Sequence, residues 1–223
     1  MKRYIWAAAL SLISLATTAR DSRADFTPIS VPDAAYTSST TLIGLGYITE
    51  GTTGITSVTD GTQTVSFDVE MTKTTVGVDW STWNSPPAVE TSTPDVLYQS
   101  SSNILVMTLS VPSTTFGFEL QGNELIESQF YVAFMEGVNL IGFVDLAVNG
   151  DGGALLFAAT SLSNPFTSVV ITNTSLDANG FAVANLRYTA VPEPASVAMV
   201  AQAIAAVGFY GWRKRRRMTA ETR

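Results

Sequence analysis

The stretch "TQTVSFDVEM" (Thr62–Met71) carries the pattern that sets the fold class of this chain. Its apolar residues alternate with polar ones, so that Val65, Phe67, Val69 and Met71 fall on one side and the polar residues on the other. Successive side chains of a β-strand point to opposite faces, so this alternation predicts a strand with one buried and one solvated face.

Further β-rich runs follow, separated by residues that favour turns. They are predicted at residues 104–111, 116–120, 130–135, 140–148, 154–160, 166–172 and 180–188. The clearest turns are Glu136–Asn139 and Asn149–Gly153, because Gly, Asn and Asp favour tight turns. No long helical periodicity interrupts the series. We expect an all-β fold in which residues 25–190 form a single, jelly-roll-like β-sandwich domain.

Composition excludes several classes of function. The 223-residue chain has no Cys and no His, which removes disulfides, thiolate nucleophiles and His-dependent catalytic triads. Residues 25–190 hold sixteen acidic and two basic residues, a net charge of −14. An acidic body of this kind repels phosphates, so no nucleic acid partner is expected.

The N-terminus has the pattern of a secretory signal peptide. Lys2 and Arg3 precede a short apolar run, and small residues stand before Asp25. Cleavage is predicted between Ala24 and Asp25, with Ala19 as an alternative site. The competing interpretation is a retained N-terminal anchor, for which the apolar run is short. We therefore expect residues 1–24 to be removed during export through the general secretion machinery.

The C-terminal segment, residues 191–217, has three parts in a fixed order. It begins with an extended break that continues neither strand nor helix: Val191, Pro192, Glu193 and Pro194. Ala195–Trp212 follow as eighteen largely apolar residues, which at about 1.5 Å per residue nearly cross a bilayer as a helix. The segment ends in a basic membrane stop: Arg213, Lys214, Arg215, Arg216 and Arg217. Residues 218–223 are then a cytoplasmic tail.

This ordered trio resembles the PEP-CTERM sorting signal of bacterial exported proteins. The resemblance implies recognition at Pro-Glu-Pro by an exosortase, a membrane-embedded cysteine enzyme. It implies a transient inner-membrane anchor, followed by release or transfer to the cell surface or extracellular matrix in bacteria that make extracellular polysaccharide. A plain single-pass anchor is the alternative, because it also needs an apolar span and a basic stop.

The body resembles a β domain that recurs with this sorting signal. The resemblance rests on "FGFEL" (Phe116–Leu120), "GALLFAATSLSNPFTSVVIT" (Gly153–Thr172) and "GFAVANLRY" (Gly180–Tyr188). Such bodies are similar to carbohydrate-binding jelly rolls. Ala184 departs from the pattern, which has Asp at this position.

Three groups of residues are candidates for a site in the body. Trp80 and Trp83 in "VDWSTWN" could stack on sugar rings, although large aromatic residues are more often packed in a core. Two pairs of carboxylates could act in glycoside hydrolysis: Asp68 with Glu70, and Glu124 with Glu127. The simpler interpretation is that all four are solvated charges of strands and loops. Turn oxygens could bind calcium, although ordinary turns explain Asn149, Asp151 and Asp177 equally well.

These patterns favour a non-enzymatic exported protein of the envelope or extracellular matrix that an exosortase sorts. No catalytic residue, metal ligand or cofactor is assigned. The alternative is a carbohydrate-binding module that acts on extracellular polysaccharide, and a glycosidase is the least favoured interpretation.

Overall fold

The computed structural model describes residues 25–100, 102–175 and 180–191. One short helix and eleven strands occur in these ranges, in the following order: β1 (Thr27–Ile29), α1 (Ala34–Ser39), β2 (Thr41–Leu42), β3 (Ile55–Thr59), β4 (Thr64–Thr75), β5 (Asp95–Gln99), β6 (Ile104–Gly122), β7 (Glu127–Glu136), β8 (Asn139–Asn149), β9 (Leu155–Thr160), β10 (Phe166–Asn173) and β11 (Phe181–Ala190). The expected all-β class is confirmed. The signal peptide and the membrane helix predicted from the sequence lie outside the described residues.

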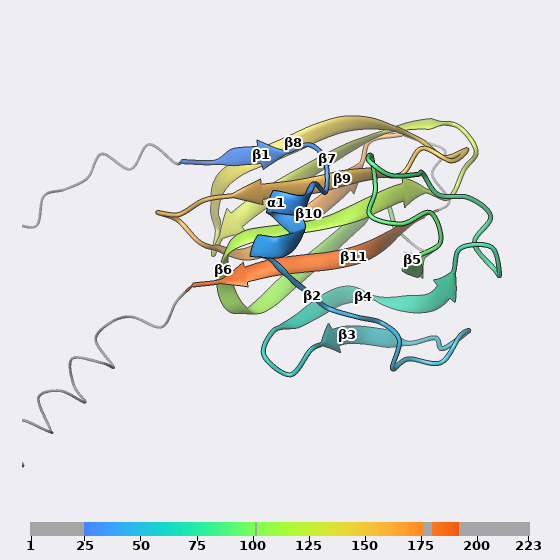
Figure 1. Cartoon of the computed structure of the whole chain (residues 1–223), viewed down its shortest axis with the longest axis horizontal. Coiled ribbons are helices and arrows are strands. Elements are labelled where there is room, and N and C mark those ends of the chain that lie inside the picture. Colours follow the sequence, from blue (N-terminus) through green and yellow to red (C-terminus); the bar gives the residue numbers. More distant parts are fainter. Residues whose placement is uncertain (1–24, 101, 176–179, 192–223) are drawn as a thin grey trace, which may run out of the picture.

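All paired strands are antiparallel and form one continuous sheet that folds into two layers (Figure 1). Layer 1 contains β3, the first part of β4, the first half of β6, and β10, β7 and β8. Layer 2 contains the last part of β4, β5, β11, the second half of β6, β9 and β1. The sandwich is thus closed on one side by two long strands that belong to both layers. Whether its connections follow a jelly roll stays a prediction.

Strand β6 replaces two strands predicted separately at residues 104–111 and 116–120. It continues through Pro112, where its partners change from β4 and β10 to β11 and β9. The amide of Gln63 supports this bend: its Nε2 donates to the carbonyl of Val111 at 2.8 Å, and its Oε1 accepts from Val111 N at 2.8 Å. A strand can therefore pass a proline here because a buried side chain takes the place of a neighbouring backbone.

Aromatic rings fill the space between the layers. Phe130 of layer 1 lies 5.5 Å from Phe181 and 6.4 Å from Phe157, which both belong to layer 2. The alternation at residues 62–71 is borne out, since Val65, Phe67 and Met71 are buried while Asp68 on the other face is exposed. The core thus comes from the inward positions of the alternating strands.

The outer face of layer 2 is covered, so it does not face solvent. Helix α1 lies across β6 and β11 (Figure 1) and packs Tyr36 against Gly117 and Ala158. A Cβ atom at Gly117 would lie 2.5 Å from the Tyr36 hydroxyl and 2.3 Å from the Ala158 Cβ, which only glycine avoids. The rest of this face is covered by the loop of residues 76–94, called the cover loop below.

Both ends of the body are attached to the same side of the sandwich. Strand β1 begins, and β11 ends, at the left in Figure 1. The Asp25 carboxylate accepts hydrogen bonds from Ser161 Oγ at 2.9 Å and Leu162 N at 2.9 Å, and the Ser161 bond is the main cause of its lowered pKa. Val191 N donates to Pro112 O at 3.0 Å.

Candidate functional site

Two tryptophans anchor the cover loop on layer 2. Glu119 and Gln121 alternate along β6, so both side chains point to the outer face of this layer. The Trp83 indole donates to Glu119 Oε2 at 2.9 Å, and the Trp80 indole donates to Gln121 Oε1 at 2.9 Å. Each buried polar group on the sheet thus receives one indole N–H from the loop.

Glu119 lies on β6 beneath the cover loop. Its side chain is fully buried, and its Oε1 accepts from Glu90 N at 2.6 Å. Burial raises the pKa of this carboxyl group, and the hydrogen bonds from Trp83 and Glu90 oppose that rise. Since both oxygens bind donors of the cover loop, Glu119 holds the loop in place.

Gln121 joins the cover loop to the turn after β8. Its Nε2 donates to Gly150 O at 2.7 Å and to Thr82 Oγ1 at 3.0 Å. Thr82 Oγ1 also accepts from Gly152 N at 3.1 Å. The backbone around Trp80 is therefore held by two other segments, β6 and the turn after β8, which favours a rigid site.

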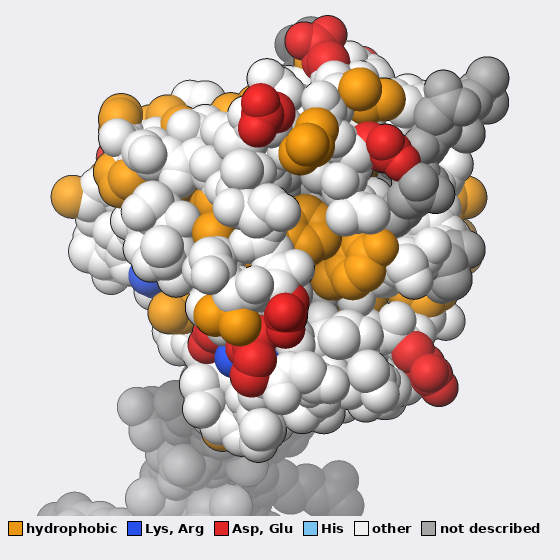
Figure 2. All heavy atoms as spheres, turned by 90° about the vertical axis from the view of Figure 1, so that its right-hand side faces the viewer, with side chains coloured by type: hydrophobic (Ala, Val, Ile, Leu, Met, Phe, Trp, Pro, Cys, Tyr) orange, Lys and Arg blue, Asp and Glu red, His pale blue; other side chains and the backbone are white. Residues whose placement is uncertain are grey.

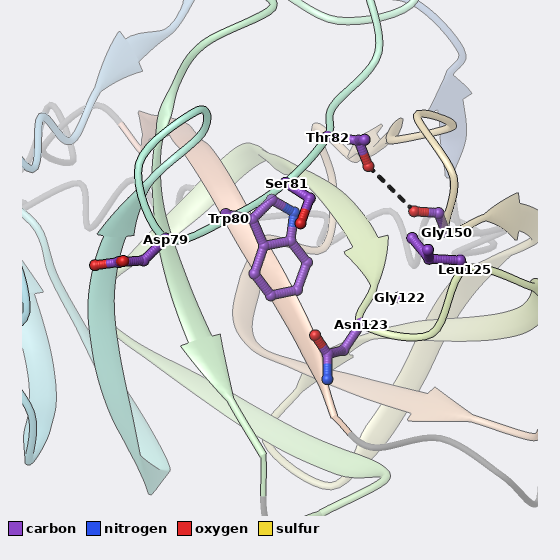
Figure 3. A pocket seen from close by; sticks show the side chains of 8 residues that line it. All are labelled: Asp79, Trp80, Ser81, Thr82, Gly122, Asn123, Leu125 and Gly150. Atoms are coloured by element: carbon purple, nitrogen blue, oxygen red, sulfur yellow. Dashed lines mark hydrogen bonds between the residues drawn. The ribbon is translucent and has the colours of Figure 1, made fainter.

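A small pocket opens beside Trp80 at this junction (Figure 3). We call it the loop pocket; its lining residues are Asp79, Trp80, Ser81, Thr82, Gly122, Asn123, Leu125 and Gly150. Its volume of about 50 Å³ has room for a few water-sized groups. It can therefore take a hydroxyl or a similar small polar group, but not a whole drug-sized ligand.

Aromatic and apolar side chains surround the loop pocket. The Tyr98 ring lies 5.2 Å from the Trp80 ring at an interplanar angle of 52°, and Asn123 Nδ2 donates to the Tyr98 hydroxyl at 3.2 Å. Leu125 is 64% exposed and Val78 is 66% exposed. Figure 2 shows this end of the molecule, with hydrophobic side chains near its middle and acidic side chains around them. The surface is apolar in the centre, polar at the edge and poor in cations.

Both tryptophan rings are packed, in line with the favoured interpretation of large aromatic residues and not with a platform formed by the two rings. Trp80 and Trp83 are each only 7% exposed, and both indole N–H groups are used inside the protein. Only Trp80 lines the loop pocket, and its aromatic neighbour is Tyr98. The sequence offered no signal for Tyr98, because it lies fifteen or more residues from both tryptophans and the pairing of β5 brings it near.

The candidate carboxylates lie apart from this pocket's centre. Asp68 and Glu70 are exposed on β4, and Asp68 Oδ1 accepts from Val106 N at 2.8 Å. Glu124 and Glu127 lie at the turn between β6 and β7, next to the pocket residue Leu125. None of the four has a structural feature that assigns it an acid or base role.

The turn considered for calcium is closed by its own hydrogen bonds. Asn149 Oδ1 accepts from Asp151 N at 2.9 Å, and Asn149 O accepts from Gly153 N at 2.8 Å. Asp177 lies outside the described residues. Within the described ranges, no group of three or more acidic side chains is arranged to hold a metal ion.

Most residues of the two terminal signals also lie outside the described ranges. These are residues 1–24, including Ala24, on one side and, on the other, everything from Pro192 through the basic stop at Arg213–Arg217. The part of the chain that the structure describes contains no helix of the length and apolarity that a membrane span requires.

Comparison with known proteins gives distant structural similarity only. No protein-family model and no curated protein matches the chain. Its structure is similar to the enzymatically active domain of bacteriophage CBA120 tailspike protein 4, with 18% identity, a TM-score of 0.31 and coverage of 58% of this chain and 19% of that one. It is also similar to the family 11 carbohydrate-binding module of cellulase Lic26A-Cel5E from Clostridium thermocellum, with 10% identity, a TM-score of 0.30 and coverage of 58% and 88%.

Proposed function

We propose that this chain is an exported, non-enzymatic protein whose β-sandwich binds a neutral polysaccharide at the loop pocket. The observation that carries this proposal is the Trp80–Tyr98 ring pair, at 5.2 Å, beside a pocket lined by hydroxyl, amide and carboxylate side chains. Sugar rings have apolar faces and hydroxyl edges, so this combination of groups suits them.

The charge of the body supports a neutral glycan. Residues 25–190 carry a net charge of −14, and no Lys or Arg lines the loop pocket. An anionic polysaccharide would therefore be repelled over most of the surface. A neutral chain meets no such penalty, and its hydroxyl groups can reach Asp79, Ser81 and Asn123.

Binding is expected to weaken when the rim is changed without altering the core. Tyr98→Leu should lower the affinity for a soluble neutral polysaccharide about tenfold, because the flat ring is lost while an apolar side chain remains. Leu125→Gln should lower it by a smaller factor. Affinity gel electrophoresis of the full chain in galactomannan, xylan and hydroxyethylcellulose measures both effects.

Leu162→Gln is the matched control for this experiment. Leu162 is 74% exposed, as Leu125 is 64% exposed, but it lies at the turn between β9 and β10. Equal retardation of Leu125→Gln, Tyr98→Leu and the unchanged protein in every polysaccharide would remove the loop pocket as a glycan site.

We further propose that residues 191–217 are a sorting signal that an exosortase processes. The resemblance of the Pro-Glu-Pro motif, apolar span and basic stop supports this proposal. The position of the loop pocket is consistent with this proposal, because the cover loop lies at the right of Figure 1 and β11 ends at the left. A chain anchored after Val191 would thus present the loop pocket on the side away from its attachment.

The intact mass of the protein from its native host tests the sorting signal. With the exosortase present, we expect a chain that begins at Asp25 and ends near Pro192–Pro194. Without the enzyme, the mass should include Ala195–Arg223. If both strains retain these residues, the segment is a plain anchor, and the glycan proposal is unaffected.

A further inference from the structure

A second cavity lies at a gap in the edge of layer 2. Residues 181–184 of β11 pair with β5, whereas Arg187 and Tyr188 pair with β2. Between these two partners the strand is irregular, and Ile43 N bonds to Leu186 O at 2.9 Å. The cavity at this gap, called the edge pocket, has a volume of about 290 Å³, close to the lower limit for small-molecule sites.

Asn185, which lines the edge pocket, has an unusual backbone conformation. Its φ angle is +49°, and every other described residue with positive φ is a glycine. A side chain in the left-handed region costs free energy that glycine avoids, although asparagine tolerates it better than most residues. Strained residues of this kind cluster at ligand sites, where the side chain has a use.

The walls of the edge pocket combine apolar and neutral polar groups. Leu42, which is 40% exposed, gives the apolar surface, whereas Ile43, Leu45 and Pro94 are buried. Thr91 gives a hydroxyl, and Asn185 contributes an amide whose nitrogen is buried. Gly44 and Gly46 also line the cavity, and a Cβ atom at either would meet nothing within 4 Å. A ligand can therefore approach the backbone of this segment closely.

The charge at the edge pocket is negative. Asp95 lines it with a side chain that is 32% exposed. The cation bonded to Asp95 is Lys73, whose ammonium group lies 2.9 Å from Asp95 and 2.7 Å from Glu50 and whose side chain is only 7% exposed. This cation is thus hidden behind its two carboxylates, and Arg187, which pairs with the lining residue Leu42, is bonded to Glu90. An anionic ligand would meet acidic groups first.

We propose that the edge pocket binds one neutral hexose unit, such as the end of a polysaccharide chain. The volume fits a single sugar ring, the exposed Leu42 side chain suits its apolar face, and Thr91 and Asp95 can bond its hydroxyl groups, with Asn185 in the same wall. This proposal rests on the proposed polysaccharide function and adds a second subsite with a different preference. The loop pocket contacts a chain along its length, whereas the edge pocket accepts a single unit.

Methyl NMR of the full chain tests the two sites separately. The protein is labelled at Leu, Ile and Val methyl groups and kept in a polyoxyethylene detergent, which carries no sugar headgroup. Methyl glycosides of glucose, galactose and N-acetylglucosamine are titrated to tens of millimolar, because single sugars bind at about the millimolar level. We expect at least one glycoside to shift Leu42 and Leu45 and to leave Leu125 unchanged.

Two variants test which groups bind the sugar. Asn185→Gly keeps the backbone conformation, because glycine favours positive φ, and removes the side-chain amide, which also contacts Glu119. Thr91→Val removes a hydroxyl at nearly constant volume. Each should weaken glycoside binding roughly threefold to tenfold, the effect of one lost hydrogen bond. Unchanged affinity in both variants would show that the side chains do not recognise the sugar and would overturn the proposal.

The remaining outcomes separate this proposal from the polysaccharide function itself. If no glycoside moves Leu42 or Leu45 while galactomannan or xylan oligosaccharides move Leu125, the edge pocket proposal fails and the loop pocket stands. If the glycosides move Leu42 and Leu45 while oligosaccharides leave Leu125 unchanged, the loop pocket fails and the edge pocket is the sugar site. If no sugar moves either group, both proposals are wrong.

Discussion

Arg187→Met is expected to lower the free energy of unfolding by about 3–5 kcal/mol, the usual cost of breaking a buried ion pair on one side. The Arg187 guanidinium bonds both oxygens of Glu90, at 2.6 Å from Nε and 2.8 Å from Nη2. Its Nη1 donates to Thr37 O at 3.2 Å and Thr40 O at 3.3 Å. One side chain thus joins β11 to the cover loop, to α1 and to the residue after α1.

Burial is the reason that this effect should be large. The Arg187 and Glu90 side chains are 12% and 15% exposed, so solvent screens their attraction weakly. Methionine would fill much of the space but would leave the Glu90 carboxylate without its partner. Urea unfolding of the full chain, followed by tryptophan fluorescence, measures the loss because Trp80 and Trp83 belong to the cover loop.

Two companion variants identify the cause. Arg187→Lys keeps the charge but loses the two-bond geometry, so its loss should be intermediate. Glu90→Gln combined with Arg187→Met removes the unpaired charge and should recover part of the stability of Arg187→Met. A loss under 1 kcal/mol for Arg187→Met would mean that the pair is effectively exposed and does not hold the cover loop.

Strand β4 and the strands from β6 onward were predictable from local runs of β-forming residues between turn signals, whereas β1, β2, β3 and β5 were not predicted. Residues 62–71 fix their buried face whatever their neighbours are, and the turn at Glu136–Asn139 needs only the local geometry of Gly137, whose φ is +59°. The union of residues 104–122 into one strand was not predictable. It depends on Gln63, which lies more than forty residues away from Val111 and supports the bend at Pro112.

The candidate site was only partly predictable for a related reason. The sequence identifies Trp80 as a possible sugar-stacking residue. How much of its ring is exposed depends on the side chains that pack against it, and these come from distant parts of the chain. Glu119 and Gln121 alternate with the apolar residues Phe118 and Leu120, which by itself does not show that they receive the two indole N–H groups under the cover loop. Such pairing over 36 and 41 positions leaves no local pattern in the sequence.

Trp83→Ala is expected to lower the free energy of unfolding by about 3–5 kcal/mol, as for other large aromatic residues removed from a core. Trp83 is 7% exposed and packs with Val89, Ala154 and the rest of the cluster under the cover loop. The substitution also takes the indole donor from Glu119, which then keeps a buried oxygen with one partner fewer. The loss should therefore exceed that of Trp83→Phe, which keeps an aromatic ring but no N–H.

A double-mutant cycle of Trp83→Phe with Glu119→Gln separates packing from hydrogen bonding. If the indole donor bonds the Glu119 carboxylate as the 2.9 Å distance indicates, the two changes should couple by about 1–3 kcal/mol. Urea unfolding of the four proteins gives this coupling. Additive losses would mean that Trp83 contributes through packing alone. The buried carboxylate would then have to be held by the Glu90 amide, and the cover loop would depend on Arg187 more than on its tryptophans.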